Sequence, residues 1–588
     1  MATPKKRTPA ADSTTPPTTR EDVRAWFHRA KFGLFIHWGI YAVPGRGEWL
    51  RSYEKISEKE YARFKPRFNP KRFNPDQWAD LAKKAGVKYM VFTTKHHDGF
   101  CMFDAHNTDW KVTNTPYGKD IVEAVTRSFE NRGIRVGYYY SIMDWHHPDY
   151  LPRMAFEAAD RPSEGHDVMD YIAFMREHLK QIITEYRPAP FVLWYDGGWL
   201  NTPESLGAAE TNAMVRKLKP DILINDRHRT KEDLITPEQR IPPTGLRDEN
   251  GNPVLWEACM TMTSHWWGYD RNETKFKEKD FLIRMMIDIV AKGGNFLLNV
   301  GPKPDGTIQK EFTERLLAIG KWLDKYSEAI FDTTASPFNR LPFYGRVTVK
   351  GDRLYVHVFT WPKQGYIQLP NLENNILDAW LVGGSQKRLP IAKRDGDWYL
   401  KLPAKPTDPA ASVIAVQLDG PPRTTPVVIR PGRRGQVELS ALYGDPVGPH
   451  GQRIRYEERN GDIVVANWYR APDSIEWEFE LPAAGIYRVD MNAIVERKGA
   501  VLDVFANPGL VTKMAPNGLP FVEGANPDAP TPTFSFTAKT SKPEGQKRQL
   551  GKVALPAGTN KLKIALKDAA GTPGIVLQSV TLVKCRQL

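Results

Sequence analysis

FVLWYDGGW, at residues 191–199, is a run of apolar and aromatic residues that ends in Asp196 and two glycines. Runs of the same kind, each ending in polar or titratable side chains, recur in the first half of the chain: FGLFIHWG (32–39), YMVFTTKHHDGF (89–100), RVGYYYSIMDW (135–145), DILINDR (221–227) and VLWEACMTM (254–262). A seventh run, GGNFLLNVGP (293–302), ends in Asn299. Apolar runs of this length, separated by helical patterns, are typical of buried parallel strands. Polar residues at the carboxyl end of strand after strand indicate the catalytic face of a (β/α)8-like barrel, and therefore an enzyme.

Helix signals occupy the intervals between these runs. Residues 74–85 begin with Asn74-Pro75-Asp76 and stop at Gly86, which are start and stop signals of a helix. Further helices are expected at 119–132, 166–187, 204–219, 279–292 and 308–325. An eighth strand is not obvious, and the weak candidate is Ala329-Ile330-Phe331. The alternation of strands and helices predicts an α/β fold, with the barrel at residues 21–335.

The sequence pattern changes after the barrel. Short alternating strands separated by Gly, Asp, Asn and Pro predict a small antiparallel β-sandwich at residues 336–420. A proline-rich joint then leads into a second all-β region at 426–588, for which we expect a jelly-roll-like sandwich and a candidate carbohydrate-binding module. The candidates for a glycan-binding face, at least half of which we expect in the core instead, are Trp468, Tyr469, Trp477 and Tyr487.

Composition and charge exclude several classes of function. The formal net charge is +13, but the basic residues are spread evenly and no nucleic-acid-binding signature is present, so we expect no nucleic-acid partner. No stretch of 18 apolar residues exists, which predicts no membrane span. The three cysteines, Cys101, Cys259 and Cys585, are too widely spaced for a disulfide framework or a zinc motif. Phosphate-loop and dinucleotide fingerprints are missing, so we expect no cofactor; the oligomeric state is not indicated.

The N-terminal segment, residues 1–20, is rich in Pro, Thr and Lys. It lacks the apolar core of a signal peptide and is expected to be a disordered lead-in. We expect a periplasmic or secreted protein whose signal peptide is absent from this sequence, with a cytoplasmic protein as the alternative.

Asp196 is the first candidate catalytic residue. It ends an expected strand and precedes Gly197 and Gly198, which let a substrate approach closely. A carboxylate in this position can attack a carbon atom as a nucleophile. The alternative is an aspartate that only caps the following turn.

A second carboxylate is needed for general acid and base catalysis, and the residues leave two candidates. Glu257 lies within an expected strand, in LWEACM, whereas Glu238 lies in a loop, in TPEQ. An acid that must also act as a base has to reach the leaving oxygen, which suits a loop. A glutamate on a barrel strand is more often buried against an Arg or a Trp N–H. The residues alone therefore favour Glu238 only slightly.

Several further side chains can bind a hydroxylated ligand. His37, His96, His97 and Arg227 supply hydrogen-bond donors, although adjacent histidines on one strand point to opposite faces, so one of His96 and His97 is a candidate structural residue. A zinc site of His37, His96, His97 and Asp98 is conceivable, but the spacing of known zinc motifs is absent, so we expect no metal. Trp194 and Trp267 offer flat faces for the apolar side of a sugar ring.

These motifs together resemble one known family. FGLFIHWGIY, KHHDGF, YYYSIMDW, WYDGGW, INDR, TPEQ and WEACMTM, followed by WWGYD, are similar to the α-L-fucosidases of glycoside hydrolase family 29. The resemblance is strong over residues 21–335 and weak over 336–420. It implies a retaining exo-hydrolase with a barrel followed by a β-sandwich, with Asp196 as nucleophile and Glu238 as acid/base. The fucose-contacting positions that it implies are His37, Glu48, His96, His97, Tyr140, Trp194, Arg227 and Trp267.

The stretch from TPEQ to CMTM resembles the subgroup restricted to α-1,3- and α-1,4-linked fucose, so the expected partner is a fucosylated oligosaccharide or polysaccharide. Residues 244–253 form an insertion in this stretch, which we expect to shape the acceptor side of the site. Two alternatives remain: an exo-fucosidase acting on sulfated fucan, which the positive charge favours, and a non-catalytic glycan-binding protein.

Overall fold

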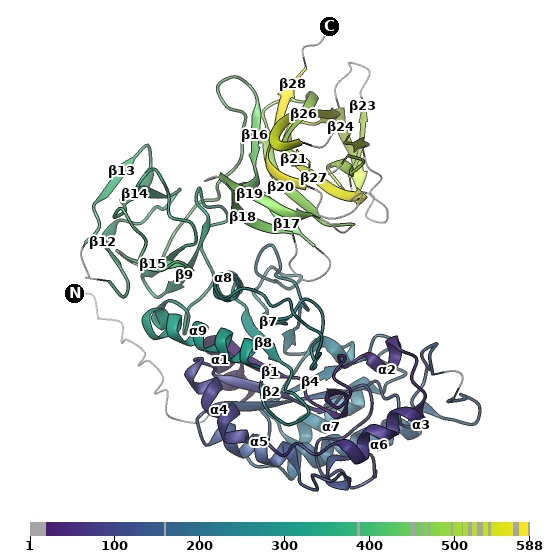
Figure 1. Cartoon of the computed structure of the whole chain (residues 1–588). Helices are drawn as coiled ribbons and strands as arrows, with labels where there is room; N and C mark the ends of the chain where they lie inside the picture. The colour runs from purple at the N-terminus through teal and green to yellow at the C-terminus, as the bar shows by residue number, and fades with distance from the viewer. Residues whose placement is uncertain are drawn as a thin grey trace, which may run out of the picture.

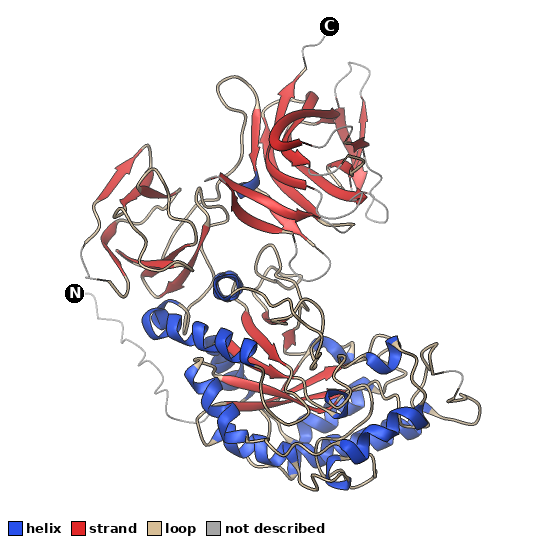
Figure 2. Ribbon diagram, viewed as in Figure 1, coloured by secondary structure: helices blue, strands red, loops and turns tan. Residues whose placement is uncertain are grey.

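The computed structural model describes residues 19–585 except 158–159, 385–387, 449–453, 460–461, 469–470, 496–497, 509, 515–519, 526–532, 539–541 and 569–574. The chain forms a helix-covered barrel followed by two regions built of β-sheets (Figures 1 and 2). The predicted lead-in therefore lies outside the described residues, apart from its last two. Thr19 caps the first helix, α1, which begins at Arg20.

Eight parallel strands form the barrel, in the order β5-β4-β3-β2-β1-β8-β7-β6. A single bridge between Asn225 and Leu234 joins the end of β5 to β6, so the barrel is nearly closed. The strands are β1 Phe32–Ile36, β2 Tyr89–Lys95, β3 Arg135–Ser141, β4 Val192–Asp196, β5 Leu223–Ile224, β6 Leu234–Ile235, β7 Leu255–Met260 and β8 Asn295–Val300. The α/β barrel predicted from the apolar runs is confirmed.

The predicted position of the eighth strand was wrong. Ala329 belongs to a 3-10 helix, η5, at Ser327–Ala329, and the missing strand is β6. With only two residues, Leu234 and Ile235, β6 is too short to show either an apolar run or an alternation. It is recognisable only by its pairing with the first two residues of β7.

Helices surround the sheet, as Figure 2 shows. They are α1 Arg20–Ala30, α2 Leu50–Tyr53, α3 Glu58–Tyr61, α4 Pro75–Lys84, α5 Ile121–Glu130, α6 Val168–Thr184, α7 Ala208–Leu218, α8 Lys279–Ala291 and α9 Lys310–Tyr326. The start signal at Asn74 is confirmed: Asn74 is the N-cap of α4, and its side chain accepts hydrogen bonds from the backbone N–H groups of Asp76 and Gln77. The six helices expected from the sequence are confirmed within a few residues at each end.

Two antiparallel sheets of four and three strands follow the barrel. Their strands are β9 Gly345–Lys350, β10 Arg353–Val358, β11 Tyr366–Leu369, β12 Ile376–Leu381, β13 Ile391–Arg394, β14 Asp397–Lys401 and β15 Ser412–Leu418. The side chains between the two sheets form a separate apolar core that includes Val347, Leu369 and Leu400. This arrangement is the small β-sandwich that the alternating pattern predicted.

The third region is also a sandwich, with six strands in one sheet, where β16 pairs with β28 beside a path of five, and five strands in the other. Its strands are β16 Val437–Ser440, β17 Asp445–Val447, β18 Arg455–Arg459, β19 Asp462–Trp468, β20 Ser474–Leu481, β21 Gly485–Val495, β22 Val501–Ala506, β23 Leu510–Met514, β24 Pro520–Ala525, β25 Phe534–Thr537, β26 Lys542–Leu555, β27 Gly558–Asp568 and β28 Ile575–Lys584. Both sheets contribute side chains to one core.

The aromatic residues considered for a glycan-binding face belong to that core. Trp468, Trp477 and Tyr487 are all buried, and the indole N–H of Trp477 donates to the carbonyl of Ser440 at 2.8 Å. Tyr469 lies outside the described residues. The expectation that at least half of the four candidates lie in the core is therefore confirmed, and these three do not form a glycan-binding face.

Helices α8 and α9 lie on the side of the barrel that faces the two sandwiches (Figure 1). Trp322 of α9 donates its indole N–H to the carbonyl of Ala411 at 3.1 Å. Arg284 of α8 donates to the carbonyls of Ala410 and Phe359 at 2.7 and 2.8 Å. These contacts dock the first sandwich against the barrel.

Candidate active site

A small pocket lies at the carboxyl ends of the barrel strands. Its lining residues come from segments that are far apart in the sequence: Phe35, His37, Trp49, His96, His97, Tyr139, Trp194, Asp196, Trp199, Arg227, Glu238, Cys259 and Trp267. Its volume is about 70 Å³. A single water needs roughly 10–15 Å³ on the same measure, so the pocket suits one small ring rather than a length of polymer.

Asp196 is the last residue of β4 and is held by two donors. The hydroxyl of Tyr139, on the neighbouring strand β3, donates to Asp196 Oδ2 at 2.9 Å. Arg227 Nη1 donates to Asp196 Oδ1 at 2.9 Å. The following residue, Gly197, has a φ of +80° and an added Cβ there would lie 2.7 Å from Met143, so only glycine fits. The carboxylate is therefore both oriented and approachable.

Arg227 joins the two candidate catalytic carboxylates. The nitrogen that contacts Asp196 also lies 2.7 Å from Glu238 Oε2. Because both oxygens contact the same Nη1 atom, their separation cannot exceed the two contacts combined. Arg227 is held in turn by Thr236, whose hydroxyl accepts from Nε at 3.0 Å. Arg227 follows the short strand β5 and Glu238 follows the short strand β6, so these two strands place both side chains beside Asp196 at the end of β4.

Glu257, the other candidate, is buried beneath the pocket. Its two oxygens accept hydrogen bonds from Tyr89 Oη at 2.6 Å and from Trp194 Nε1 at 2.9 Å. Burial raises the pKa of Glu257 to about 7. The structure thus shows the buried contact with a Trp N–H that is usual for a glutamate on a barrel strand, and it excludes Glu257 from the pocket lining.

His37 is a neutral hydrogen-bonding group with a defined tautomer. Burial lowers the pKa of His37 to about 3. Its Nδ1 lies 2.7 Å from Asn299 Oδ1, while Asn299 Nδ2 donates to the carbonyl of Trp267 at 2.7 Å. Since that carbonyl can only accept, the amide orientation is fixed and His37 Nδ1 carries the hydrogen. His37 Nε2 is left as an acceptor for a ligand hydroxyl.

His97 is likewise a neutral histidine with a defined tautomer. Ser141 Oγ donates to the carbonyl of Met143 at 2.7 Å and therefore accepts from His97 Nδ1 at 2.6 Å. His97 Nε2 is then an acceptor, 3.7 Å from Asp196 Oδ2. Burial lowers the pKa of His97 to about 3, so the ring stays neutral at ordinary pH. The neighbouring His96 also lines the pocket, and its buried Nδ1 has no partner among the described residues.

Tyr140 does not lie in the pocket, so the position predicted for it was wrong. Its hydroxyl pairs with His178 of α6 at 2.9 Å, on the outer side of β3. Tyr139 takes the place beside Asp196 instead. Side chains alternate along a strand, and β3 is buried on both faces, so the burial pattern does not say which tyrosine faces inward.

The remaining predicted residues have different degrees of contact with the pocket. Glu48 is buried behind Trp267: its carboxylate accepts from the backbone N–H groups of Trp267 and Gly268 at 3.1 and 2.8 Å, and burial raises its pKa to about 7. Trp194 lines the pocket, but its ring already stacks on Tyr139, 5.7 Å between centroids. Trp267 is only half-buried. Trp267 therefore offers the more accessible face for a sugar.

Sequence reasoning missed the aromatic rim. Trp199 is 44% exposed and stacks on Trp49, with ring centroids 6.1 Å apart and an interplanar angle of 21°. Trp49 follows Glu48 in the sequence, and Trp199 is the last residue of the WYDGGW motif. Each residue therefore lies next to a position that the motifs singled out, but the sequence gives no sign that the two rings are in contact. Among the described residues, the lining of this small pocket includes none of the insertion 244–253, and the expectation that the insertion shapes the acceptor side stays a prediction.

No three His, Cys, Asp or Glu side chains of the described residues form a group suited to a metal ion. Within the same part of the chain, no helix is long and apolar enough to cross a membrane.

A family model described as α-L-fucosidase matches residues 2–328. The chain belongs to the α-L-fucosidase family. It is accordingly a glycoside hydrolase, and the resemblance inferred from the motifs is confirmed at the level of the family.

Named relatives of this α-L-fucosidase family member include proteins from Bos taurus and Dictyostelium discoideum. The tissue α-L-fucosidase of Bos taurus is 32% identical over 378 residues, which cover 59% of this chain and 76% of the relative. The α-L-fucosidase of Dictyostelium discoideum is 32% identical over 432 residues, which cover 64% of this chain and 88% of the relative.

Solved α-L-fucosidase structures share the fold. Isoenzyme 1 from Paenibacillus thiaminolyticus is 36% identical with a TM-score of 0.65, covering 68% of this chain and all of the other. A Bacteroides thetaiotaomicron α-L-fucosidase, solved as a trapped covalent intermediate, is 27% identical with a TM-score of 0.61, covering 70% of this chain and all of the other. The enzyme of Vibrio sp. strain EJY3, at 23% identity and a TM-score of 0.67, covers 95% of this chain and shares its overall fold.

Proposed function

We propose that this protein is a retaining, exo-acting α-L-fucosidase that releases terminal fucose through a covalent fucosyl-enzyme intermediate. The observation that carries the proposal is the shared Arg227 Nη1, which contacts Asp196 at 2.9 Å and Glu238 at 2.7 Å. Retaining glycosidases hold their two carboxyl groups about 5–5.5 Å apart. The common nitrogen sets an upper limit on the separation of the two contacting oxygens, and that limit is compatible with this spacing and too short for an inverting pair.

In the proposed first step, Asp196 attacks the anomeric carbon and forms the glycosyl ester, while Glu238 donates its proton to the leaving oxygen. In the second step, Glu238 takes a proton from water while that water attacks the anomeric carbon, breaks its bond to Asp196 and releases the free carboxylate. The Glu238 side chain is 42% exposed, which gives it room to turn from Arg227 toward the glycosidic oxygen. Tyr139 and Arg227 stabilise the carboxylate that departs.

The other predicted residues have binding roles in this proposal. His37 Nε2 and His97 Nε2 are acceptors for sugar hydroxyls, and Trp267 covers an apolar face of the ring. His96, Trp194 and Arg227 complete the wall of the pocket. Glu48 holds the backbone of Trp267 in place. Tyr140 lies outside the pocket and has no binding role. The pocket volume of about 70 Å³ supports removal of one terminal unit at a time.

For the linkage, we propose α-1,3- or α-1,4-linked fucose on oligosaccharides or glycoconjugates. The support is the sequence of the loop that carries Glu238 and of β7, which resembles the subgroup restricted to these linkages. The exposed Trp199 on the rim of the pocket offers a face for the sugar that bears the fucose.

The decisive experiment follows hydrolysis of an aryl α-L-fucoside by proton NMR. Retention requires that α-L-fucose appears first and mutarotates only later to the β-anomer; first appearance of the β-anomer would exclude the intermediate. A panel of Lewis trisaccharides, 2′-fucosyllactose and sulfated fucan oligomers then tests the linkage. Rapid release from the Lewis trisaccharides alone supports the proposal, and release from 2′-fucosyllactose or sulfated fucan at a similar rate contradicts it.

A further inference from the structure

A second and larger cavity lies where the barrel meets both sandwiches. Its wall is built from α8, from the loop that follows Glu238, from residues 335–346 and from the start of the third region. Its volume is about 480 Å³, within the roughly 300–1,000 Å³ of ligand-binding pockets. The exposed side chains of Thr244, Arg247 and Asn339 lie at its edge, so it is open to solvent.

The lining carries a marked excess of positive charge. Two carboxylates, Asp288 and Asp445, stand against six cations, which are Arg247, Arg284, Lys292, Arg340, Arg346 and Arg455. Arg340 and Asp445 neutralise each other in a two-bond pair with both distances at 2.8 Å. The other five cations face one remaining lining carboxylate, Asp288, and of these five Arg455 also pairs with Glu457, outside the lining, at 3.0 Å.

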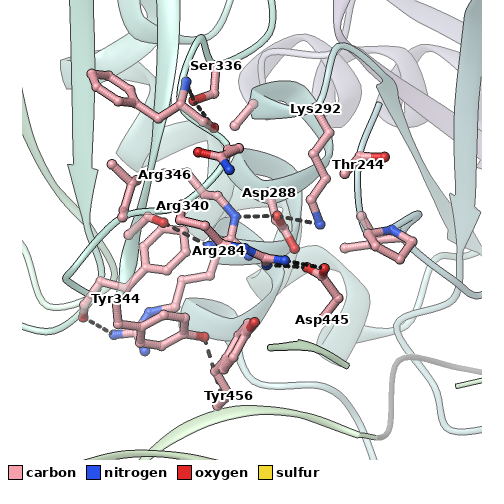
Figure 3. Close-up of a pocket in the computed structure, with 18 of the residues that line it drawn as sticks. Thr244, Arg284, Asp288, Lys292, Ser336, Arg340, Tyr344, Arg346, Asp445 and Tyr456 are labelled. Carbon is pink, nitrogen blue, oxygen red and sulfur yellow. Dashed lines mark hydrogen bonds and ion pairs between the residues drawn. The ribbon is translucent and has the colours of Figure 1, made fainter. Parts of the chain in front are cut away.

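Figure 3 shows how three of the remaining cations, Arg284, Lys292 and Arg346, are arranged. Arg346 and Lys292 share a single partner, Asp288, at 2.5 and 3.0 Å. Burial lowers the pKa of Lys292; Asp288 counteracts this, and the charge of Arg346 lowers the pKa further. Arg284 donates to backbone carbonyls, and no carboxylate pairs with it among the described residues. Partly buried like charges repel one another, and an anion in the cavity relieves that repulsion.

Aromatic and aliphatic surfaces complete the wall. Tyr344 packs against Phe359 and against Tyr456 of β18, with ring centroids 5.1 and 5.6 Å apart. Arg455 lies over the ring of Phe281, 4.6 Å from its centroid. A mixture of flat rings and fork-shaped guanidinium groups suits a ligand with apolar ring faces and anionic substituents.

We propose that this junction cavity binds an acidic sugar residue, one that carries a sulfate ester or a carboxylate. Guanidinium groups recognise both anions through paired hydrogen bonds, and the rings of Tyr344 and Phe281 contact the sugar faces. The site is distinct from the catalytic pocket: the two linings share no residue. Acidic glycans are thereby held on the enzyme while a terminal fucose is removed elsewhere.

The two sites are linked through one loop. Glu238 lines the catalytic pocket, and Ile241, three residues later, lines the junction cavity. Three residues span no more than about 11 Å, so a glycan bound in the cavity lies close to the chain that carries Glu238.

Isothermal titration with oligosaccharides that contain no fucose tests the proposal, because such probes are not directed at the catalytic pocket. The probes are a sulfated galactan tetrasaccharide, its desulfated counterpart and tetragalacturonate. We expect the wild-type protein to bind at least one acidic probe more tightly than the neutral one by about tenfold or more, with weaker binding at high salt. The preference between the two acidic probes identifies the anion. Equal affinity for the desulfated and acidic probes, or no binding, overturns the proposal.

A matched pair of variants distinguishes the cavity from general surface charge. Arg455 and Arg459 lie on the same strand, β18, both are 38% exposed and both pair with Glu457, at 3.0 and 3.3 Å. Only Arg455 lines the cavity. Arg455→Gln should weaken binding of the acidic probe about tenfold, and Arg459→Gln should leave it unchanged. Equal losses in the two variants contradict the proposal.

Lys292→Gln provides an independent check, since Arg346 and Asp288 then remain as a neutral pair. It should weaken binding of the acidic probe, and unchanged affinity in a folded Lys292→Gln protein counts against the cavity. Hydrolysis of an aryl fucoside is measured on every variant. Hydrolysis without acidic-probe binding overturns only this inference, whereas binding without hydrolysis counts only against the catalytic assignment.

Discussion

The Tyr139 hydroxyl donates a 2.9 Å hydrogen bond to Asp196 Oδ2 from the neighbouring barrel strand. Tyr139 is completely buried, and burial together with the Asp196 charge raises the pKa of its hydroxyl, so it remains a donor at all ordinary pH values. One oxygen of Asp196 is therefore fixed by Tyr139 and the other by Arg227.

Tyr139→Phe should lower kcat/KM about 10–100-fold, because a hydrogen bond to a charged group contributes about 1.5–3 kcal/mol. Tyr140→Phe is the matched control: it removes a hydroxyl from the same strand that pairs with His178 instead. Steady-state kinetics on an aryl fucoside should be near wild type for Tyr140→Phe, even if its thermal stability falls. The reverse ranking would assign Tyr140 to the site after all.

Asp196→Gly should abolish turnover by roughly 10⁴-fold or more while the protein stays folded, because no covalent intermediate can form. Added azide should restore part of the activity and yield β-L-fucosyl azide. Circular dichroism and product analysis by NMR check both parts. A variant that keeps more than about a tenth of the wild-type rate would exclude Asp196 as the nucleophile.

Glu238→Gln and Glu257→Gln should differ in their dependence on the leaving group. Loss of an acid costs about 10²–10⁴-fold, but an activated aryl leaving group departs without protonation. Glu238→Gln should therefore impair hydrolysis of oligosaccharides far more than hydrolysis of an activated aryl fucoside. Glu257→Gln, which alters a buried contact with Trp194, should affect both substrates alike. The selective pattern in Glu257→Gln would reverse the assignment.

The buried carboxyl of Glu257 should make stability depend on pH. Burial raises its pKa from 4.5 to about 7, so between these values the folded protein holds a proton that the unfolded chain has released. Its contribution to stability is present below pH 4.5 and is lost as the pH rises to about 7. The melting temperature of Glu257→Gln should consequently fall less between pH 5 and 7 than that of the wild type, by differential scanning fluorimetry. Parallel curves would mean that Glu257 is ionised throughout.

A chain that ends near Gly420 should still hydrolyse small fucosides, since the pocket lining comes entirely from residues 35–267. The melting temperature should fall, because truncation exposes Phe281 and Tyr344, which now contact Arg455 and Tyr456. Loss of aryl fucoside hydrolysis would show that the third region is needed to hold the barrel together.

Local features were sufficient to predict much of the architecture. A buried strand such as β4 needs a continuous apolar run, and a helix such as α4 needs a cap at Asn74, so each leaves its mark on adjacent residues. Asp196 could be singled out because a strand, a carboxylate and glycines are consecutive. The catalytic roles of Asp196 and Glu238 stay predictions, now with a geometry that the kinetic experiments can test.

Other features depend on residues that meet only when the barrel closes. Strand β6 has two residues and exists through its pairing with β7, so no local pattern reveals it. The choice between Tyr139 and Tyr140 depends on which face of β3 turns toward Asp196, and both faces are buried. The junction cavity joins Asp288, Arg346 and Arg455 from three separate regions. The sequence by itself determined the elements and the chemical groups that each one carries, because those depend on neighbouring residues. Only the tertiary structure decided which groups share a hydrogen bond or a cavity, because that depends on contacts across the whole chain.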